Sequence, residues 1–481
     1  MEHFDVLVVG AGLSGISAGV HLRTRCPKKT FAILEGRAAI GGTWDLFRYP
    51  GIRSDSDMHT LGYSFKPWKA EKAIADGPAI LEYVRDTAKE YGIDKEIRFG
   101  HQVVRATFST DSARWVVEAM HEGKEVRLLC HFLFVCSGYY DYENGYTPEF
   151  PGIEKFQGRV VHPQKWTPDI DYTGKKVVVI GSGATAVTLV PALAERAAKV
   201  TMLQRSPTYV ISRPAVDGVA LRLRKSLPPM VAYGLTRWKN VALGLAFFQI
   251  CRTFPERAKS ILVGEVHKAL GKSVDVDTHF TPKYRPWDQR VCLVPDGDLF
   301  DALRGGKAAV VTDQIETFTE TGITLRSGKT LEADLVVTAT GLVLRFLGGM
   351  ELVVDGKKIE PSETMNYKGA MLSDVPNLAV TFGYTNASWT LKCDLTCEYV
   401  CRLLLHMDRK GYRTCVPRLT GKDVEPEPLL DFSSGYVQRA LGKLPKQGSK
   451  APWRVHQNYP LDILGLRHGA LEDGVLELRR R

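Results

Sequence analysis

The stretch FDVLVVGAGLSGISAGVHLRTR at residues 4–25 decides the fold of this chain. Its first part, FDVLVVG, is an unbroken apolar run, typical of a strand buried on both faces of a sheet. A helix-like segment follows, and FAILEG at 31–36 is a second apolar run. A strand, a glycine turn, a helix and a further strand form a right-handed crossover unit. The sequence therefore predicts an α/β fold.

The turn in this unit has the glycine spacing GxGxxG, at Gly10, Gly12 and Gly15. The first glycine permits a tight turn, the second lets the backbone approach a pyrophosphate, and the third allows close packing of helix on strand. The free N–H groups of the helix N-terminus favour the phosphates. Glu35 ends the second strand, 20 positions after Gly15. A carboxylate there binds ribose hydroxyls and repels a 2′-phosphate, so we predict a site for FAD or NAD.

The same type of unit returns at 176–205, as KVVVIG, SGATAVTLVPALAERA and KVTMLQR. Gly181, Gly183 and Ala186 give the spacing GxGxxA. Arg205, followed by Ser206, stands where the first unit has its acid. A guanidinium fork matches phosphate oxygens, so this loop predicts an NADPH site. The alternative is that Arg205 is only a surface charge at a strand end.

These units predict an α/β chain with two Rossmann-like dinucleotide-binding domains, one for FAD and one for NADPH, with a helical insertion. Further strand-like runs lie at 115–119, 131–136 and 334–341. We expect residues 1–145 to form the first part of the FAD-binding domain, 146–335 to form the NADPH-binding domain with the helical insertion at about 215–285, and 336–481 to return to the FAD-binding domain and the C-terminal region.

The composition of the chain favours some classes of binding partner over others. The net charge of +10 favours anionic partners, which two dinucleotides would partly explain. The chain has no zinc finger, no RNP-type aromatic stretch and no long basic tract, so we expect no nucleic-acid partner. Its nine cysteines include no CxxC pair and it begins without a signal peptide, which favours a cytoplasmic setting.

The longest apolar run, VALGLAFFQIC at 241–251, is shorter than the ~20 residues that a membrane-spanning helix needs. Its neighbours Arg237, Lys239 and Arg252 leave open a surface helix that makes peripheral membrane contact through residues 230–255. A helix packed inside the protein is the favoured interpretation.

Two further motifs resemble sequence fingerprints of a known protein family. GGTWDLFRYPGIRSD at 41–55 has the pattern [A/G]GxW, four residues, [F/Y]PG, three residues and Asp. Phe156, Gly158, His162 and Trp166 give FxGxxxHxxxW. These motifs resemble the fingerprints of the class B flavin monooxygenases, and specifically of the type I Baeyer–Villiger monooxygenases. Trp166 favours that branch. Thr167 departs from it, because the family usually has Pro or Asp there.

The resemblance implies an FAD-dependent, NADPH-consuming monooxygenase that inserts one oxygen atom from O2 into a ketone. The stretches YPGIRSDSDMHTLGYSF and GYTNASWTLK resemble family members that also oxygenate thioether or thioamide sulfur. The alternative is a flavin-containing monooxygenase restricted to S- and N-oxygenation. A non-catalytic nucleotide sensor is a third, weaker interpretation. Disulfide reductases are disfavoured, because no redox cysteine pair is present.

The resemblance also implies the catalytic residues. Arg290, in the sequence PWDQR, matches the arginine that stabilises negative charge during oxygen insertion. Asp55 matches the aspartate that orients this arginine. Asp57 is chemically similar, but the fingerprint spacing selects Asp55. His162 is not expected to act as a base. The resemblance suggests that it couples the positions of the two domains.

Beyond the glycines and Glu35, the resemblance implies further cofactor contacts. The expected FAD contacts are Ser14, Thr43, Trp44, Asp45, Arg53, Ser54 and the backbone at Val103. The expected NADPH contacts are Gly181, Ser182, Gly183, Ala184, Thr185, Ala186, Arg205 and Ser206. Many relatives have a lysine before the catalytic arginine, where this chain has Gln289, so we predict weaker discrimination between NADPH and NADH.

Cys393, Cys397 and Cys401 are spaced by four on a predicted helix and therefore share one face. Thiolates can bind zinc, but no matching histidine or second cysteine pair accompanies them. We therefore expect them to pack in the core and expect no metal site.

Overall fold

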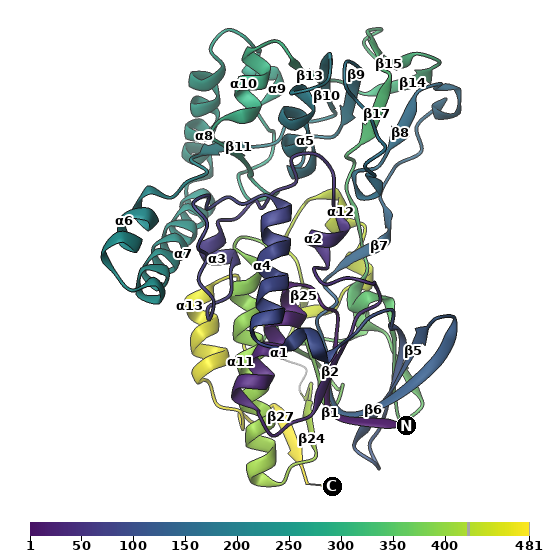
Figure 1. Cartoon of the computed structure of the whole chain (residues 1–481), viewed down its shortest axis with the longest axis vertical. Helices are drawn as coiled ribbons and strands as arrows, with labels where there is room; N and C mark the ends of the chain where they lie inside the picture. The colour runs from purple at the N-terminus through teal and green to yellow at the C-terminus, as the bar shows by residue number, and fades with distance from the viewer. Residues whose placement is uncertain (421–423, 481) are drawn as a thin grey trace.

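The computed structural model describes residues 1–420 and 424–480. Two large sheets, one mixed and one parallel, lie at opposite ends of the molecule, and both termini lie at the same end (Figure 1). No helix in the described ranges is long and apolar enough to cross a membrane.

The first sheet has nine strands, in the order β20-β19-β4-β5-β6-β1-β2-β3, with β23 also paired to β6. Its parallel centre consists of β1 (Glu2–Val9), β2 (Phe31–Leu34), β3 (Ile97–Arg98), β6 (Lys124–Val135) and β23 (Leu378–Val380). The side chains of Val6, Leu7 and Val8 are fully buried, as the unbroken apolar run predicts for a strand covered on both faces. Helix α1 (Leu13–Arg25) connects β1 to β2 and packs beside α11 (Trp389–Lys410).

An antiparallel extension completes this sheet. It consists of β4 (Gln102–Ser109), β5 (Arg114–His121), β19 (Glu351–Val354) and β20 (Lys357–Ile359). Strand β19 comes from the second half of the chain and pairs in parallel with β4. The first sheet is therefore built from two separate parts of the sequence.

The second sheet is entirely parallel, in the order β13-β10-β9-β17-β8. Its strands are β8 (Arg159–Val161), β9 (Lys176–Ile180), β10 (Lys199–Gln204), β13 (Ala308–Thr312) and β17 (Leu335–Thr338). Helices α5 (Ala184–Ala194) and α10 (Asp298–Arg304) pack against it, and their apolar side chains share one core with the sheet. A small antiparallel sheet packs on the other face: β14 (Ile315–Thr319), β15 (Gly322–Leu325) and β16 (Thr330–Glu332).

The chain crosses between the two sheets through β7 (Tyr140–Gly145) and returns through β18 (Leu342–Leu344). The two crossing strands pair antiparallel with each other. Both α/β units of the sequence prediction are thus present, and the predicted fold class is confirmed.

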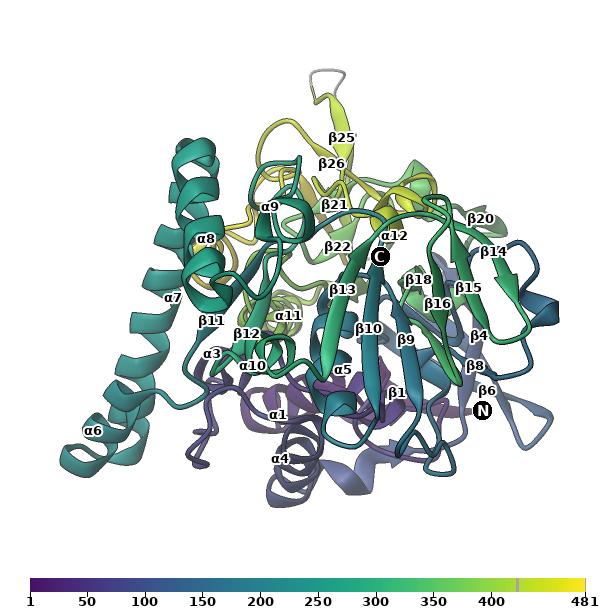
Figure 2. The same ribbon diagram turned by 90° about the horizontal axis from the view of Figure 1, so that it is seen from above.

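A group of helices leaves the second sheet between β11 (Val210–Arg213) and β12 (Cys292–Pro295). Its members are α6 (Gly218–Ser226), α7 (Pro229–Thr253), α8 (Pro255–Leu270) and α9 (Val276–His279). Helix α7 lies along the outer edge of the molecule, with α6 at one end and α8 beside it (Figure 2). It also contacts α3 (Met58–Leu61), which belongs to the first part of the chain.

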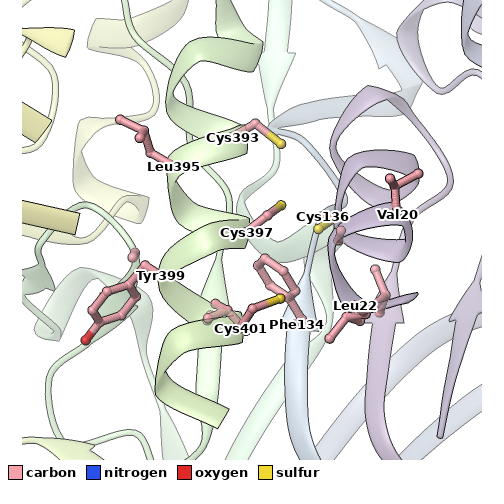
Figure 3. Close-up of a cluster of buried hydrophobic side chains, with 14 of the residues drawn as sticks. Val20, Leu22, Phe134, Cys136, Cys393, Leu395, Cys397, Tyr399 and Cys401 are labelled. Carbon is pink, nitrogen blue, oxygen red and sulfur yellow. The ribbon is translucent and has the colours of Figure 1, made fainter. Parts of the chain in front are cut away.

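The three cysteines of α11 lie on the side of the helix that faces α1 and β6, close to Val20, Leu22, Phe134 and Cys136 (Figure 3). Each has at most 1% of its surface exposed. They pack as small core residues, as predicted.

Candidate active site

A cavity of about 1330 Å³ lies between the two sheets and is lined by both glycine loops. It exceeds the roughly 300–1,000 Å³ of a pocket for one drug-sized ligand, so it has room for more than one. Among the predicted cofactor residues, the lining includes Gly10, Gly12, Ser14, Glu35, Thr43, Trp44, Arg53, Ser54, Val103, Gly181, Ser182, Gly183, Ala184, Thr185, Arg205 and Ser206. The cavity also contains Asp55 and Arg290.

The first glycine loop is shaped by close backbone contacts. Gly10 has φ +102°, a conformation that favours glycine, and a Cβ there would lie 2.7 Å from the carbonyl oxygen of Cys136. A Cβ on Gly15 would lie 1.7 Å from the carbonyl oxygen of Gly10. Gly15 is therefore behind the cavity wall, where it lets α1 start directly against β1. Both observations agree with the roles predicted for the first and third glycines.

Glu35 lies at the end of β2 and holds the first glycine loop in place through hydrogen bonds. Its carboxylate accepts hydrogen bonds from the backbone N–H of Ala11 (2.7 Å) and of Arg37 (2.9 Å). Burial raises the pKa of Glu35 above its ordinary value. The same carboxylate borders the cavity, where its remaining lone pairs can accept ribose hydroxyls.

Asp45 is placed differently from its prediction, because it does not line the cavity. Only 2% of its side chain is exposed, and it pairs with Arg37 (2.6 Å), Arg48 (3.0 Å) and Arg85 (3.2 Å). These three guanidinium groups hold the carboxylate behind the wall of the cavity. Arg37 does line the cavity. Asp45 therefore orients Arg37, a cationic cavity residue that sequence reasoning missed.

The fingerprint at 41–55 joins the two halves of the site. Arg53 forms an ion pair with Asp298 at the start of α10, on the second sheet. Ser54 donates a hydrogen bond to the carbonyl of Ser56 (2.7 Å). Arg53 thus fastens the first glycine-loop region to the second, a contact that spans 245 positions and has no local signal in the sequence.

The second glycine loop differs from the first in the free space beside its second glycine. Gly181 has φ +138°, and a Cβ there would lie 2.3 Å from the carbonyl oxygen of Ala339. A Cβ on Gly183 would meet nothing within 4 Å, although Gly183 lines the cavity. Open space at this position leaves the backbone at the start of α5 free to approach a phosphate. Ala186 is fully buried behind the loop.

Arg205 and Ser206 follow β10 at the rim of the cavity, and both are exposed. Ser182 holds this turn against the glycine loop by donating to the carbonyl of Ser206 (3.0 Å). No described residue forms an ion pair with Arg205. Its guanidinium is therefore available to an anionic ligand, as the phosphate interpretation requires. Gln289 also lines the cavity.

Arg290 and Asp55 form an ion pair inside the cavity, although 235 positions separate them in the sequence. About a third of each side chain is exposed, 32% for Arg290 and 35% for Asp55, and this exposure faces the cavity. The adjacent carboxylate of Asp55 raises the pKa of Arg290 well above its ordinary value. Arg290 also donates to the carbonyl of Thr385 (3.4 Å). The cation therefore has a fixed position and stays charged.

Asp57 is excluded from this role by its contacts. It caps α3 by accepting from the N–H of Thr60 (3.1 Å), and it accepts from Asn240 (2.9 Å). The spacing argument that selected Asp55 agrees with this placement.

Sequence reasoning missed Tyr139 and Phe382, which form an aromatic wall with Trp389 beside the ion pair. Tyr139 stacks on Trp389 at 5.1 Å between ring centroids and contacts Phe382 at 5.3 Å. Trp389 donates its indole N–H to the hydroxyl of Ser14 (2.7 Å), in the first glycine loop. Arg290 is close enough to Tyr139 to influence its titration, and burial raises the pKa of this tyrosine. The N-terminus of α11 thus closes the site with apolar rings, which exclude water.

The second fingerprint lies outside the cavity. Trp166 is buried against Tyr172 at 6.0 Å. His162 hydrogen-bonds the carbonyl of Gly341 (3.1 Å) and also touches Gly145, at the two crossings between the sheets. Burial lowers the pKa of His162 and favours its neutral form. A connecting role agrees with this position, and a role as base does not.

Comparisons with known proteins agree with this site. The family model for flavin-binding monooxygenase-like proteins matches residues 72–226, and a model for an NAD(P)-binding Rossmann-like domain matches residues 8–70. The chain is 55% identical to the FAD-containing monooxygenase EthA of Mycobacterium tuberculosis, covering 100% of this chain and 98% of EthA. It is 52% identical to the putative FAD-containing monooxygenase MymA of the same organism, covering 99% and 97%.

The fold is similar to that of an oxidized steroid monooxygenase bound to NADP, with a TM-score of 0.78, 22% identity and 100% coverage of both chains. Identity with EthA and MymA over the full length shows descent, and the cavity contains the ion pair that the family fingerprint implies. The chain belongs to the family of flavin-dependent monooxygenases that includes EthA and MymA.

Proposed function

We propose that this protein uses NADPH and O2 to insert one oxygen atom into ketones, which yields esters or lactones, and that it also oxidises thioether or thioamide sulfur. The observation that carries the proposal is the Arg290–Asp55 ion pair in the cavity between the two glycine loops. A fixed cation at that place stabilises negative charge on a reacting oxygen.

The two cofactors follow from the two loops. The first loop, with Glu35 at its ribose position, fits FAD, and the second, with Arg205 open to the cavity, fits NADPH. The name of EthA includes FAD, and the steroid monooxygenase structure contains NADP. Bound FAD, reduced by NADPH, supplies the activation of O2.

The residues of this chain supply position and charge. When the carbonyl carbon of a ketone is attacked, negative charge develops on the carbonyl oxygen. The guanidinium of Arg290 can donate hydrogen bonds to that oxygen without reorganising, because Asp55 and the Thr385 carbonyl already fix its direction. The rings of Tyr139 and Trp389 keep water from the site, which strengthens this interaction.

Sulfur oxidation has different electrostatic needs. A thioether sulfur is a neutral nucleophile, and its attack on an activated oxygen generates no negative charge on the substrate. Arg290 therefore contributes less to this reaction than to ester formation. Both reactions can share one cavity.

The test is incubation of the FAD-loaded protein with NADPH, air, an aryl ketone and an aryl thioether, followed by mass spectrometry. Ester together with sulfoxide supports the whole proposal. Sulfoxide without ester, across a series of ketones, limits the protein to heteroatom oxygenation. NADPH oxidation that yields only hydrogen peroxide with every ketone and sulfur probe contradicts the substrate assignment.

Gln289→Lys is expected to increase the preference for NADPH over NADH about ten- to a hundredfold. A charged hydrogen bond to a phosphate contributes roughly 1.5–3 kcal/mol, and Gln289 offers no charge. The measurement is the ratio of kcat/KM values for the two coenzymes. Gln289→Met is the control, because it removes the polar group and adds no charge. An unchanged ratio in Gln289→Lys would mean that Arg205 alone selects the phosphate.

A further inference from the structure

Helix α7 leaves large apolar side chains exposed although it buries two polar ones. The side packed against the protein buries Thr236 and Arg237 together with Ala232, Tyr233, Val241 and Cys251. The outward side carries Leu235, Trp238 and Leu243, each at least 50% exposed. A surface helix of a globular protein normally exposes charged and polar side chains on its outward side.

The inner side of α7 is held to the protein by hydrogen bonds. Arg237 donates to the carbonyls of His59 (2.9 Å) and Gly62 (2.8 Å), and Thr236 donates to the carbonyl of Ala232 (2.8 Å). The hydroxyl of Tyr233 donates to the carbonyl of Tyr63 (3.0 Å). The bonds from Arg237 and Tyr233 to residues 59–63 fix the rotation of the helix, so its exposed apolar side cannot turn inward without breaking buried hydrogen bonds.

Exposed apolar side chains are concentrated around this helix. Of the seventeen large ones that are exposed in the described residues, nine lie between residues 219 and 261. They are Val219, Met230, Val231, Leu235, Trp238, Leu243, Ile250, Phe254 and Ile261. Leu461 and Leu464 are exposed nearby, since Trp238 contacts Tyr459 at 5.7 Å. An apolar patch of this kind normally marks a binding surface.

The same segment carries most of the net charge of the protein. Residues 218–272 contain ten Lys and Arg against two Glu, an excess of eight in a chain with a net charge of +10. Arg222 and Lys225 on α6, and Arg257 and Lys272 on and after α8, are exposed, and no described carboxylate forms an ion pair with them. The exposed apolar side chains thus lie among cations.

We propose that this apolar and basic face, residues 218–261, docks on the surface of an anionic lipid membrane, with α7 lying in the interfacial plane. Exposed leucines and a tryptophan can enter the headgroup region, while Lys and Arg bind anionic headgroups. A second copy of this chain is a poorer occupant, because a two-fold contact would bring two equally basic faces together.

Docking through this face would bring the lipid close to the active site. On the same helix Phe248 contacts Trp287 at 5.6 Å, three positions before Arg290. An apolar ketone or thioether dissolved in the membrane would then be released beside the cavity. This consequence rests on the proposed function, whereas the docking itself does not.

Vesicle co-sedimentation tests the docking without measuring catalysis. FAD-loaded protein is mixed with vesicles of phosphatidylcholine alone or of phosphatidylcholine with phosphatidylglycerol, at low and high salt. We expect binding to the phosphatidylglycerol vesicles that weakens with salt, and little binding to phosphatidylcholine alone. The triple variant Leu235→Ser, Trp238→Ser and Leu243→Ser should lower the partition coefficient at least about tenfold, and Arg222→Gln with Lys225→Gln should lower it severalfold.

The matched control is Leu405→Ser with Leu419→Ser, which removes exposed leucines elsewhere (39% and 37% exposed) and should bind as the parent does. FAD content and thermal unfolding show that each variant is folded. Absence of a vesicle-bound fraction at low salt overturns the proposal, and so does equal binding by the triple variant. A parent that is dimeric by light scattering, and becomes monomeric in the triple variant, would assign the face to self-association instead.

Discussion

Arg290→Ala is expected to lower ester formation from ketones by about a hundred- to a thousandfold, while FAD content and NADPH oxidation remain measurable. The guanidinium of Arg290 lies in the cavity that both glycine loops line, and its ion pair with Asp55 holds it there. Removing it leaves the charge on the reacting oxygen without its fixed donor. NADPH oxidation continues because the glycine loops and Arg205 do not depend on Arg290. The measurement is ester yield per NADPH consumed, with hydrogen peroxide as the competing product.

The control series separates charge from geometry. Arg290→Lys keeps the charge but loses the planar fork, so it should recover only part of the ester yield. Asp55→Asn keeps a hydrogen-bond acceptor but removes the negative charge that fixes Arg290, and it should lower kcat more than it raises the KM for the ketone. Sulfoxide formation should fall far less than ester formation in Arg290→Ala. Ester yield at the parent level in that variant would remove Arg290 from the mechanism.

Local sequence patterns predicted the parts of the fold that are themselves local. The two strand–glycine–helix units form as the apolar runs and glycine spacing indicate, because strand, turn, helix and second strand follow one another in the sequence, although β1 also pairs with β6 and β9 with β17. The contact between Arg290 and Asp55 spans 235 positions, and only the family fingerprints connected them. Spacing within one motif could not have shown that contact.

Several contacts that build the site join distant parts of the chain, and the sequence did not predict these pairings. Trp389 reaches Ser14 across 375 positions, and Arg53 reaches Asp298 across 245. Neither pair has a periodicity or motif that a sequence can show. Asp45 was expected in the cavity, but three arginines hold it behind the wall, and two of them, Arg48 and Arg85, are ordinary surface residues in the sequence.

For helix α7, the apolar composition favoured an interpretation that differs from the observed packing. The run at 241–251 is apolar on nearly all sides, so a helix packed inside the protein was the favoured interpretation. The structure packs one side only, through Tyr233, Thr236 and Arg237. Polar groups are buried on the inner side because the carbonyls of His59 and Gly62 accept hydrogen bonds from Arg237 there. Hydrogen-bond partners, which a hydropathy pattern does not contain, decided which side of the helix faces out.

The two glycine loops should respond differently to the addition of one methyl group. Gly15→Ala is expected to prevent folding or FAD retention, because its Cβ would lie 1.7 Å from the carbonyl oxygen of Gly10. Backbone cannot move aside as a flexible side chain can, so α1 would have to shift away from β1. Such a shift costs more than the roughly 1–3 kcal/mol of ordinary overpacking. Expression yield, flavin absorbance and thermal unfolding measure the effect.

Gly183→Ala is the matched substitution in the second loop, and it should leave the fold intact, because a Cβ there meets nothing within 4 Å. The methyl group would instead project into the space that the phosphates of NADPH need. We therefore expect normal FAD content and an unchanged melting temperature, together with a KM for NADPH raised about tenfold or more. A loss of stability in Gly183→Ala would show that the open space is filled in the folded protein. A normal KM would mean that the pyrophosphate lies elsewhere along α5, since the methyl group leaves the rest of the loop as it was.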